Sequence, residues 1–408
     1  MNRFSLIYYR IKSIGIYRQT ADSKAVCALM NMIEATNNKR LDRFFESWGE
    51  LVCELYQNGE NTLSALIYDL LLRDDNAFSR ACASGKPSGE LLKIAESEIS
   101  ALSELSQITA LELLGLANVP TELSRELVIW KNGEELCKSA ADIAAQLCDY
   151  YAANGCGIFS QYRAFVWQNG MLVPVESPDT VTFADLKGYK TQRKTLLDNT
   201  LAFLANRPCN NVLLYGDRGT GKSSSVHALL NELCGDGLRM IELSKADIAD
   251  FHRISSMISK IPLKFIVFID DLSFSQDNDS FAQLKAALEG GLAAKPSNML
   301  IYATTNRRHL IKETFDSRQG EELHVNDSIQ EEMSLSDRFG IVITFINPDR
   351  KQFYDILDAM AKDRGLDIST EELHFLAERW SFQKGGRSPR GAKQFIDSLC
   401  SGGEKEEK

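Results

Sequence analysis

Eight consecutive residues, Gly216–Ser223, have the spacing G-x-x-x-x-G-K-[ST], in which glycines, a lysine and a serine can hold a phosphate. An apolar strand is predicted before them at Asn211–Tyr215, and a helix after them at Ser224–Leu233. Backbone N–H groups of such a loop point at one phosphate, and the helix N-terminus adds a partial positive charge. The pattern therefore predicts a phosphate-binding P-loop, although a chance glycine turn has the same spacing.

Two residues of this loop have predicted roles beyond backbone contact. Lys222 is expected to reach the β- and γ-phosphates, and Ser223 to offer its hydroxyl oxygen to Mg²⁺. The residues predicted to contact the nucleotide are Gly216, Asp217, Arg218, Gly219, Thr220, Gly221, Lys222, Ser223 and Ser224. The loop thus predicts that ATP and Mg²⁺ bind together.

A second acidic site follows the apolar run Phe265–Ile269, which predicts a buried strand. That strand would bring Asp270 to its C-terminal edge, where the carboxylate can hold the magnesium shell. Asp271 would then polarise the attacking water. Acidic residues also follow strands in ordinary loops, so this interpretation depends on the P-loop upstream.

The composition limits the class of protein. The 408 residues suffice for two or three domains, and 44% hydrophobic with 25% charged residues is typical of globular chains. A net charge of −10 disfavours general DNA binding. The nine cysteines form no C-x-x-C pair, so we expect free thiols in a reducing cytoplasm rather than a zinc site or disulfides. No run reaches the ~20 apolar residues of a membrane span, and the first residues lack the apolar run of a signal peptide.

The periodicity of apolar residues divides the chain into five predicted segments. They are an N-terminal helical domain (1–160), a β-hairpin or linker (161–180), an α/β core (181–347), a helical lid (348–400) and a disordered tail (401–408). The hairpin is predicted from Asn169-Gly170 between two apolar runs, and we expect it to bridge two domains. The core alternates strands and helices, which predicts a parallel sheet with helices on both faces.

Individual elements can be placed within these segments. The predicted N-terminal helices are Leu41–Tyr56, Thr62–Leu72, Leu91–Leu105 and Ala140–Tyr151. The predicted core strands are Val212–Tyr215, Arg239–Leu243, Phe265–Ile269, Met299–Ala303 and Ile341–Phe345. The predicted lid helices are Lys351–Lys362, Thr370–Trp380 and Ser388–Leu399. The polar stretch from Ile311 to Ser334 is predicted to be a mobile loop.

With these motifs in place, the sequence resembles the AAA+ ATPases. It resembles more closely an uncharacterised bacterial family of predicted AAA+ ATP-binding proteins that is labelled a domain of unknown function. The motifs that carry the resemblance are Asn210–Ser224, Asp270–Phe274, Leu288–Gly291, Ala303–Arg308 and Leu335–Gly340. The resemblance implies a P-loop NTPase (AAA+) fold of the α/β class, with a C-terminal helical lid, and it implies ATPase activity.

The resemblance also implies further roles. Leu186–Tyr189 resembles the segment that packs near the adenine. Asn306 matches the sensor-1 residue, whose amide holds the attacking water and the γ-phosphate, although a turn residue also fits this place. Arg338 matches the arginine finger, which acts on a neighbouring subunit and implies a homo-oligomer. An ion pair of Arg338 with Asp337 is the alternative.

Arg390 matches the sensor-2 arginine of the lid. The local sequence agrees, because Ser388 is a good N-cap and Pro389 suits the first helical position. A cation in the first turn opposes the helix dipole, which indicates an anionic partner such as a phosphate. A solvated surface arginine is the alternative.

Two departures from the family pattern bear on activity. Asp271 stands where many AAA+ proteins carry Glu, and its shorter side chain would hold the attacking water less well. Ser244–Phe251 lacks the aromatic-x-Gly of substrate-threading pore loops, which disfavours an unfoldase.

Three functions are consistent with these motifs. The first is an ATPase that couples ATP binding and hydrolysis to a conformational switch acting on an unidentified protein partner. The second is a nucleic-acid remodeller or loader that uses two basic clusters; it is not favoured, because charge neutralisation of ATP explains them as well. These clusters are Lys384, Arg387, Arg390 and Lys393, and Arg307-Arg308. The third is an ATP-binding scaffold that turns over little.

Overall fold

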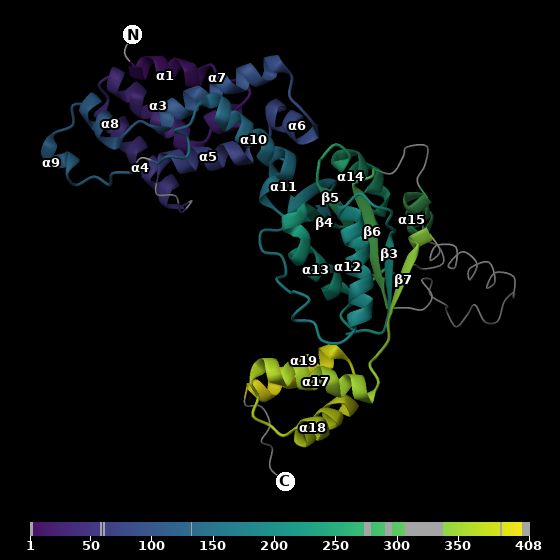
Figure 1. Ribbon diagram of the computed structural model, residues 1–408. Coiled ribbons are helices and arrows are strands. Elements are labelled where there is room, and N and C mark those ends of the chain that lie inside the picture. The colour runs from purple at the N-terminus through teal and green to yellow at the C-terminus, as the bar shows by residue number, and fades with distance from the viewer. Residues whose placement is uncertain are drawn as a thin grey trace. The chain divides into compact units, whose positions relative to one another are not determined.

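The computed structural model describes residues 3–57, 59, 62–131, 133–272, 279–289, 296–306, 338–383 and 386–401. Two compact units divide the chain, Met1–Gln161 and Tyr162–Lys408. The predicted loop at 311–334 and residues 402–408 of the predicted tail lie outside the described residues. Figure 1 shows the helices and strands with the labels used below.

The first unit is helical in its described residues. Its helices are α1 (Arg3–Lys12), α2 (Arg18–Ala21), α3 (Lys24–Asn37), α4 (Leu41–Gln57), α5 (Leu63–Arg73), α6 (Ala77–Ser84), α7 (Gly89–Ser106), α8 (Ala110–Leu116), α9 (Thr121–Ser124), α10 (Ala140–Asn154) and α11 (Ile158–Gln161). The four helices predicted from the sequence correspond to α4, α5, α7 and α10 and are confirmed to within a few residues. Phe44 and Trp48 on α4 are buried as their spacing predicted, and the rings of Trp48 and Trp130 lie 4.7 Å apart.

The second unit is built on a seven-stranded sheet in the order β2-β1-β4-β5-β6-β3-β7. The strands are β1 (Ala164–Gln168), β2 (Met171–Pro174), β3 (Val212–Gly216), β4 (Leu238–Glu242), β5 (Lys264–Ile269), β6 (Met299–Thr305) and β7 (Ile341–Phe345). All neighbouring strands pair in parallel except β1 and β2, which form the predicted hairpin. The five predicted core strands are therefore confirmed, each within two residues.

The hairpin predicted within residues 161–180 is part of the sheet. β1 pairs in parallel with β4, with Ala164 opposite Met240, so the hairpin extends the sheet at one edge. Alternate side chains of β1 explain the pairing, because Phe165 and Trp167 are each 1% exposed and pack into the second unit. The turn signal at Asn169-Gly170 specified a hairpin but carried no information about which strand it would join.

Helices cover both faces of the sheet. All seven residues of β6 and the last five of β5 are buried, and successive side chains of a strand point to opposite faces. α12 (Lys190–Leu204) and α13 (Lys222–Leu233) lie side by side (Figure 1). The remaining described helices of the sheet region are η1 (Cys234–Asp236), η2 (Lys245–Asp250), α14 (Phe251–Ile258) and α15 (Asp279–Glu289).

Three helices form the predicted lid, α17 (Arg350–Arg364), α18 (Thr370–Gln383) and α19 (Pro389–Cys400). They have a hydrophobic core of their own, which includes Phe353, Leu357 and Phe395. The lid is joined to β7 by residues 346–349. The predicted α/β fold with a C-terminal helical lid is thus confirmed.

Candidate functional site

The P-loop connects the end of β3 to the start of α13, as the sequence predicted. Gly216 has φ +139°, and a Cβ there would lie 2.0 Å from the carbonyl oxygen of Phe345. Gly221 has φ +88° and forms the N-cap of α13. A side chain is excluded at the first position by the neighbouring strand, and one at the second would be strained. The two glycines of the motif therefore allow the turn from strand to helix.

The side chain of Lys222 is buried, with 6% exposed, and its ammonium group bonds to the backbone of the loop itself. Nζ donates to the carbonyl oxygens of Gly216 and Asp217, at 2.9 and 2.8 Å, and to Oδ1 of Asn306 at 2.9 Å. Burial lowers the pKa of Lys222, while Asp217, Asp270 and Asp271 act against this shift. The hydrogen-bond partners are neutral, so a phosphate can compete with them for the charge.

The acidic pair lies beside the loop, at the carboxyl ends of β5 and β6. Ser223 Oγ donates to Asp270 Oδ1 at 2.6 Å, which places the two predicted magnesium ligands together. Asn306 Nδ2 donates to Asp271 Oδ1 at 2.8 Å. Asp271 has φ +50°, a left-handed backbone that non-glycine residues seldom adopt. The predicted residues therefore lie in two parts of a hydrogen-bonded network, Ser223–Asp270 and Lys222–Asn306–Asp271.

Thr304 completes this network and was not identified from the sequence. Its Oγ1 donates to the carboxylate of Asp270 and accepts the backbone N–H of Asp271 at 2.9 Å. The backbone N–H of Leu272 also donates to the carbonyl oxygen of Thr304, at 2.7 Å. Thr304 is thus placed to fix the carboxylate of Asp270 and the backbone of Asp271. The sequence placed it within the motif Ala303–Arg308, two residues before Asn306, but assigned it no role.

The remaining P-loop residues connect the loop to the lid. The Asp217 carboxylate accepts the backbone N–H of Asn347 at 2.7 Å, in the segment that leads to α17. The carbonyl oxygen of Gly219 accepts the backbone N–H of Arg390 at 3.1 Å, in the first turn of α19. Thr220 Oγ1 donates to the carbonyl oxygen of Asp217 at 2.8 Å. The loop is therefore hydrogen-bonded to both ends of the lid.

A cavity of about 1270 Å³ opens between the P-loop, the acidic pair and the lid. Arg218, Ser224 and Arg390 line it together with the other P-loop residues from Gly219 onward. The predicted N-cap at Ser388 is present, with Ser388 Oγ accepting the N–H of Gly391 at 3.1 Å. Oxygen donors are what Mg²⁺ prefers, and it usually takes one or two carboxylates plus phosphate oxygens and waters. Ser223 and Asp270 fit that requirement. Among the described residues, no group of three or more His, Cys, Asp or Glu could hold a metal by itself.

Several predicted basic residues take different positions. Arg338 precedes the buried Phe339 and is not among the described residues that line the P-loop cavity. Arg387 is engaged by Glu378, with donor distances of 3.0 and 2.9 Å, which raises the pKa of Arg387. Arg307, Arg308, Asp337 and Lys384 lie outside the described residues.

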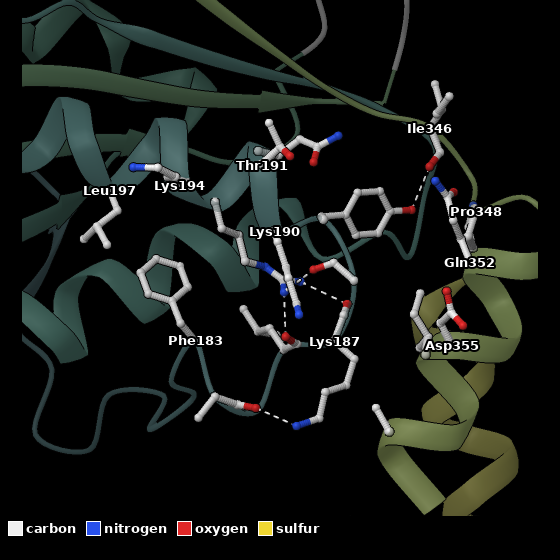
Figure 2. Close-up of a pocket in the computed structure, with 18 of the residues that line it drawn as sticks. Phe183, Lys187, Lys190, Thr191, Lys194, Leu197, Ile346, Pro348, Gln352 and Asp355 are labelled. Carbon is white, nitrogen blue, oxygen red and sulfur yellow. Dashed lines mark hydrogen bonds between the residues drawn. The ribbon is translucent and has the colours of Figure 1, made fainter.

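A second cavity, of about 1110 Å³, lies between the segment Leu186–Tyr189 and the lid helix α17. Figure 2 shows Phe183 and Leu197 on the core side of this cavity and Gln352 and Asp355 on the lid side. Tyr189 Oη donates to the carbonyl oxygen of Ile346 at 2.6 Å, just before the lid. Leu186, Lys187 and Arg193 line both cavities, so the segment predicted to pack near the adenine separates them.

Parts of this chain are similar to known proteins. The chain is 31% identical over 116 residues to the "Probable mitochondrial chaperone BCS1-A" of Dictyostelium discoideum, covering 24% of this chain and 27% of that protein. A structure titled as the RuvB Holliday junction branch migration motor of Thermotoga maritima matches with 18% identity and a TM-score of 0.39. That match covers 54% of this chain and 64% of the RuvB chain. The chain thus spans less than a third of the curated relative and under two thirds of the RuvB structure.

Among the described residues, none of the helices combines the length and apolar character needed to cross a membrane. The resemblance to AAA+ ATPases indicated by the motifs is confirmed. Residues 160–403, more than half of the sequence, match one family, and the chain belongs to that family, described as "Protein of unknown function (DUF815)".

Proposed function

We propose that this AAA+ protein binds ATP with Mg²⁺ at the P-loop cavity and hydrolyses it to ADP and phosphate. The observation that supports this best is the hydrogen-bonded network at the carboxyl edge of the sheet, in which Thr304 joins two groups of residues. These groups are Ser223 with Asp270, and Lys222 with Asn306 and Asp271. The Lys222 ammonium group would exchange its neutral carbonyl partners for a phosphate. The same network offers oxygen acceptors suited to a metal and a water.

Each residue has a distinct part in the proposed reaction. Ser223 and Asp270 would hold Mg²⁺, which would neutralise the developing charge on the phosphates. Asp271 accepts a proton from the attacking water, and Asn306 orients that carboxylate through the hydrogen bond at 2.8 Å. Arg390 adds positive charge from the lid side of the cavity. The chain therefore supplies an acceptor for the water proton and cations around the phosphates.

We infer that nucleotide binding sets the position of the lid. Support comes from Asp217 and Gly219, which contact Asn347 before the lid and Arg390 within it. A phosphate that rearranges the loop backbone must alter both contacts, so the lid responds to occupancy. We propose that this response controls an unidentified protein partner through the N-terminal helices. A nucleic-acid partner is less well supported, because Arg387 is already paired with Glu378.

Phosphate release by the purified protein tests the catalytic proposal. Asp271→Asn removes the proton acceptor but keeps the size of the side chain, and we expect release to fall by about 100-fold or more with ATP affinity retained. Lys222→Ala serves as the blank for contaminating activity. Equal release from wild type and from both variants would contradict hydrolysis at this site and would favour an ATP-binding scaffold.

Mixing two inactive variants tests the proposed oligomer. Arg338→Ala keeps its own P-loop but lacks the finger, whereas Lys222→Ala keeps the finger but lacks a working P-loop. If Arg338 acts on a neighbouring subunit, the mixture should recover part of the wild-type phosphate release, because mixed neighbours include complete sites. A mixture no more active than its components would contradict a shared site.

Recovery of bound proteins from cell extract tests the switch. Asp271→Asn should stall the ATP-bound state, and we expect it to retain partner proteins that wild type releases. Addition of excess ADP should reduce that retention, since the partner would follow the nucleotide state. The same proteins recovered at the same level with wild type, variant and ADP would contradict a nucleotide-gated partner. A DNA-binding assay across a salt series separates the nucleic-acid alternative, which predicts binding that weakens steeply as salt rises.

A further inference from the structure

Arg193 is a buried cation beside the P-loop that neither the motifs nor the proposed reaction uses. It lies in the first turns of α12 and is 7% exposed. Nη1 donates to the carbonyl oxygens of Leu186 and Gly188 at 2.6 and 2.7 Å, and Nη2 donates to that of Lys187 at 3.3 Å. Nε donates to Ser225 Oγ at 3.4 Å. One guanidinium thus holds three successive carbonyl groups.

Within the described part of the chain, the charge of Arg193 is not paired with a carboxylate. No Asp or Glu in the described part of the chain lies within 4.0 Å of the guanidinium. Burial lowers the pKa of Arg193 to about 10, so the group still carries its charge at neutral pH. A buried arginine is normally paired with an anion, because removing the charge from water is costly. For Arg193 this cost is maintained next to the phosphate-binding loop.

The position of Arg193 connects two parts of the site. Ser225 lies in the first turn of α13, and its Oγ donates to the carbonyl oxygen of Gly221 at 2.7 Å. Arg193 Nη2 lies 3.9 Å from where a Cβ on Gly221 would be, so the guanidinium sits against the loop itself. Arg193 also borders both cavities. Its bonds therefore join the segment 186–188 to the start of the P-loop helix.

Lys187, the middle residue of that segment, is also fixed by its own side chain. Nζ donates to the carbonyl oxygen of Ala184 at 2.8 Å, drawn as a dashed line in Figure 2, and forms an ion pair with Asp363 of α17. The segment is therefore held on one side by the lid and on the other by Arg193. Loss of Arg193 would remove the side-chain bonds that join the segment to the P-loop helix and leave the ion pair with the lid.

We propose that Arg193 is a positioning residue that fixes the segment 186–188, predicted to pack near the adenine, relative to the P-loop. The parts of the site that bind the base and the phosphates of a nucleoside triphosphate are then held at a fixed distance from each other. The inference rests on the proposed nucleotide binding at the P-loop and names a residue that makes the base contribute to affinity. Only arginine suits this place, because its planar fork can donate to several carbonyl groups at once. Lysine carries the same charge as a single flexible point and cannot reproduce the fork.

The test compares two ligands that share the phosphates but not the base. Affinities of Mg²⁺-ATP and Mg²⁺-tripolyphosphate are measured by calorimetry for wild type, Arg193→Lys and Arg193→Met. With Arg193→Lys we expect ATP affinity to fall about tenfold and tripolyphosphate affinity by less than about twofold, because charge is kept and rigid placement is lost. With Arg193→Met both affinities should fall, and ATP affinity should fall further.

Two control variants separate this role from other effects of the substitution. Arg207→Met removes one exposed positive charge just after α12 and should leave both affinities unchanged. Leu196→Ala destabilises the same helix from its buried side and should lower the melting temperature without changing the ratio of the two affinities. If Leu196→Ala lowers the ratio of ATP affinity to tripolyphosphate affinity as much as Arg193→Lys does, the effect is one of general stability. That result would overturn the inference.

The outcomes for the wild type and the variants are distinct. If wild type binds ATP more tightly than tripolyphosphate and Arg193→Lys keeps that ratio within about twofold, the positioning role is overturned while nucleotide binding stands. If wild type binds neither ligand, the proposed function fails, and the inference fails with it. A selective loss of ATP affinity in Arg193→Lys supports both.

Discussion

Two aspartates in different units of this protein both accept hydrogen bonds from hydroxyl groups, but one is buried and the other is exposed. In the first unit Asp74 Oδ2 accepts from the backbone N–H and Oγ1 of Thr20, at 3.0 and 2.6 Å, and its Oδ1 accepts from Asn76 Nδ2 at 2.9 Å. In the second unit Asp270 accepts from the hydroxyls of Ser223 and Thr304. Asp74 is 2% exposed, whereas Asp270 is exposed at the rim of the P-loop cavity.

A carboxylate with hydroxyl partners is therefore not by itself a site. Both oxygens of Asp74 are taken up inside a sealed core, and burial raises the pKa of its carboxyl group. Such a group fixes the local packing of helices and has no route to a ligand. Asp270 has donors on Oδ1 but borders open space, so it can add a metal to its partners. Access to the cavity, and not the type of hydrogen-bond donor, therefore distinguishes the proposed metal ligand Asp270 from the structural Asp74.

Removal of the open carboxylate should have the greatest consequence. Asp270→Ala should reduce the gain in ATP affinity that Mg²⁺ provides by about 100-fold, since it removes a charged ligand. Stability of both units should change little because the side chain is exposed. Calorimetric titration of ATP with Mg²⁺ and with a chelator measures this gain directly. A magnesium-dependent gain as large as that of wild type would remove Asp270 from the proposed metal site.

Removal of the sealed carboxylate should have the opposite pattern. Asp74→Ala leaves the donors of Thr20 and Asn76 unpaired, and we expect the first unit to lose about 2 kcal/mol of stability. Hydrogen exchange of amides in α3 and α5 reports on that unit alone. ATP affinity should be unchanged, which is the matched contrast with Asp270→Ala. Reduced ATP affinity with unaltered exchange would contradict the distinction between the two networks.

Thr304 offers an intermediate case, since it belongs to the open network but is itself 2% exposed. Thr304→Val keeps the shape and removes the hydroxyl that holds Asp270 and Asp271. We expect phosphate release to fall about tenfold, because the Asp270 carboxylate and the Asp271 backbone N–H each lose a positioning partner. Thr200→Val, which removes a buried hydroxyl bonded to Tyr302, is the control and should leave release unchanged. An equal fall in phosphate release with both substitutions would contradict a specific role of Thr304, because loss of any buried threonine hydroxyl would then have the same effect.

A dependence of stability on pH should be the weakest of these effects. Because the folded-state pKa of Asp74 is raised, its protonated form is favoured by folding. Its stabilising contribution is full below the unfolded pKa of about 3.8 and is lost as pH rises through the raised value. Asp74→Asn cannot titrate, so the stability of wild type relative to this variant should decrease with rising pH in that window. Exchange rates in α3 that show the same pH dependence in both proteins would contradict the assignment.

Sequence patterns predicted the chemistry of the open network and little of the sealed one. The P-loop and Asp270 could be predicted because a fixed spacing follows from the way a strand, a turn and a helix meet a phosphate. Asn306 was predicted from the family resemblance. Apolar runs such as Phe265–Ile269 also indicated the strands, because a parallel sheet is buried on both faces. Local spacing was therefore sufficient for the elements and for the residues that end them.

Other features depend on contacts between segments far apart in the sequence. The pairing of β1 with β4, the hydroxyl of Thr304 and the fork of Arg193 all arise in this way. No periodicity marks Arg193, since an arginine in a helix is ordinarily a surface residue. No sequence pattern marks Asp74 either, since an aspartate is also ordinarily a surface residue. These residues became visible only when their partners were brought together in three dimensions.

Both the proposed reaction and the role of Arg193 require that the P-loop holds a triphosphate with magnesium through Lys222. Calorimetric titration of wild type and Lys222→Ala with ATP and Mg²⁺ tests this requirement, with Arg207→Met as the variant that also loses one positive charge. We predict saturable heat for wild type and Arg207→Met and none for Lys222→Ala at the same concentrations. Heat that persists unchanged in Lys222→Ala, or that is missing from wild type, would contradict triphosphate binding at this loop.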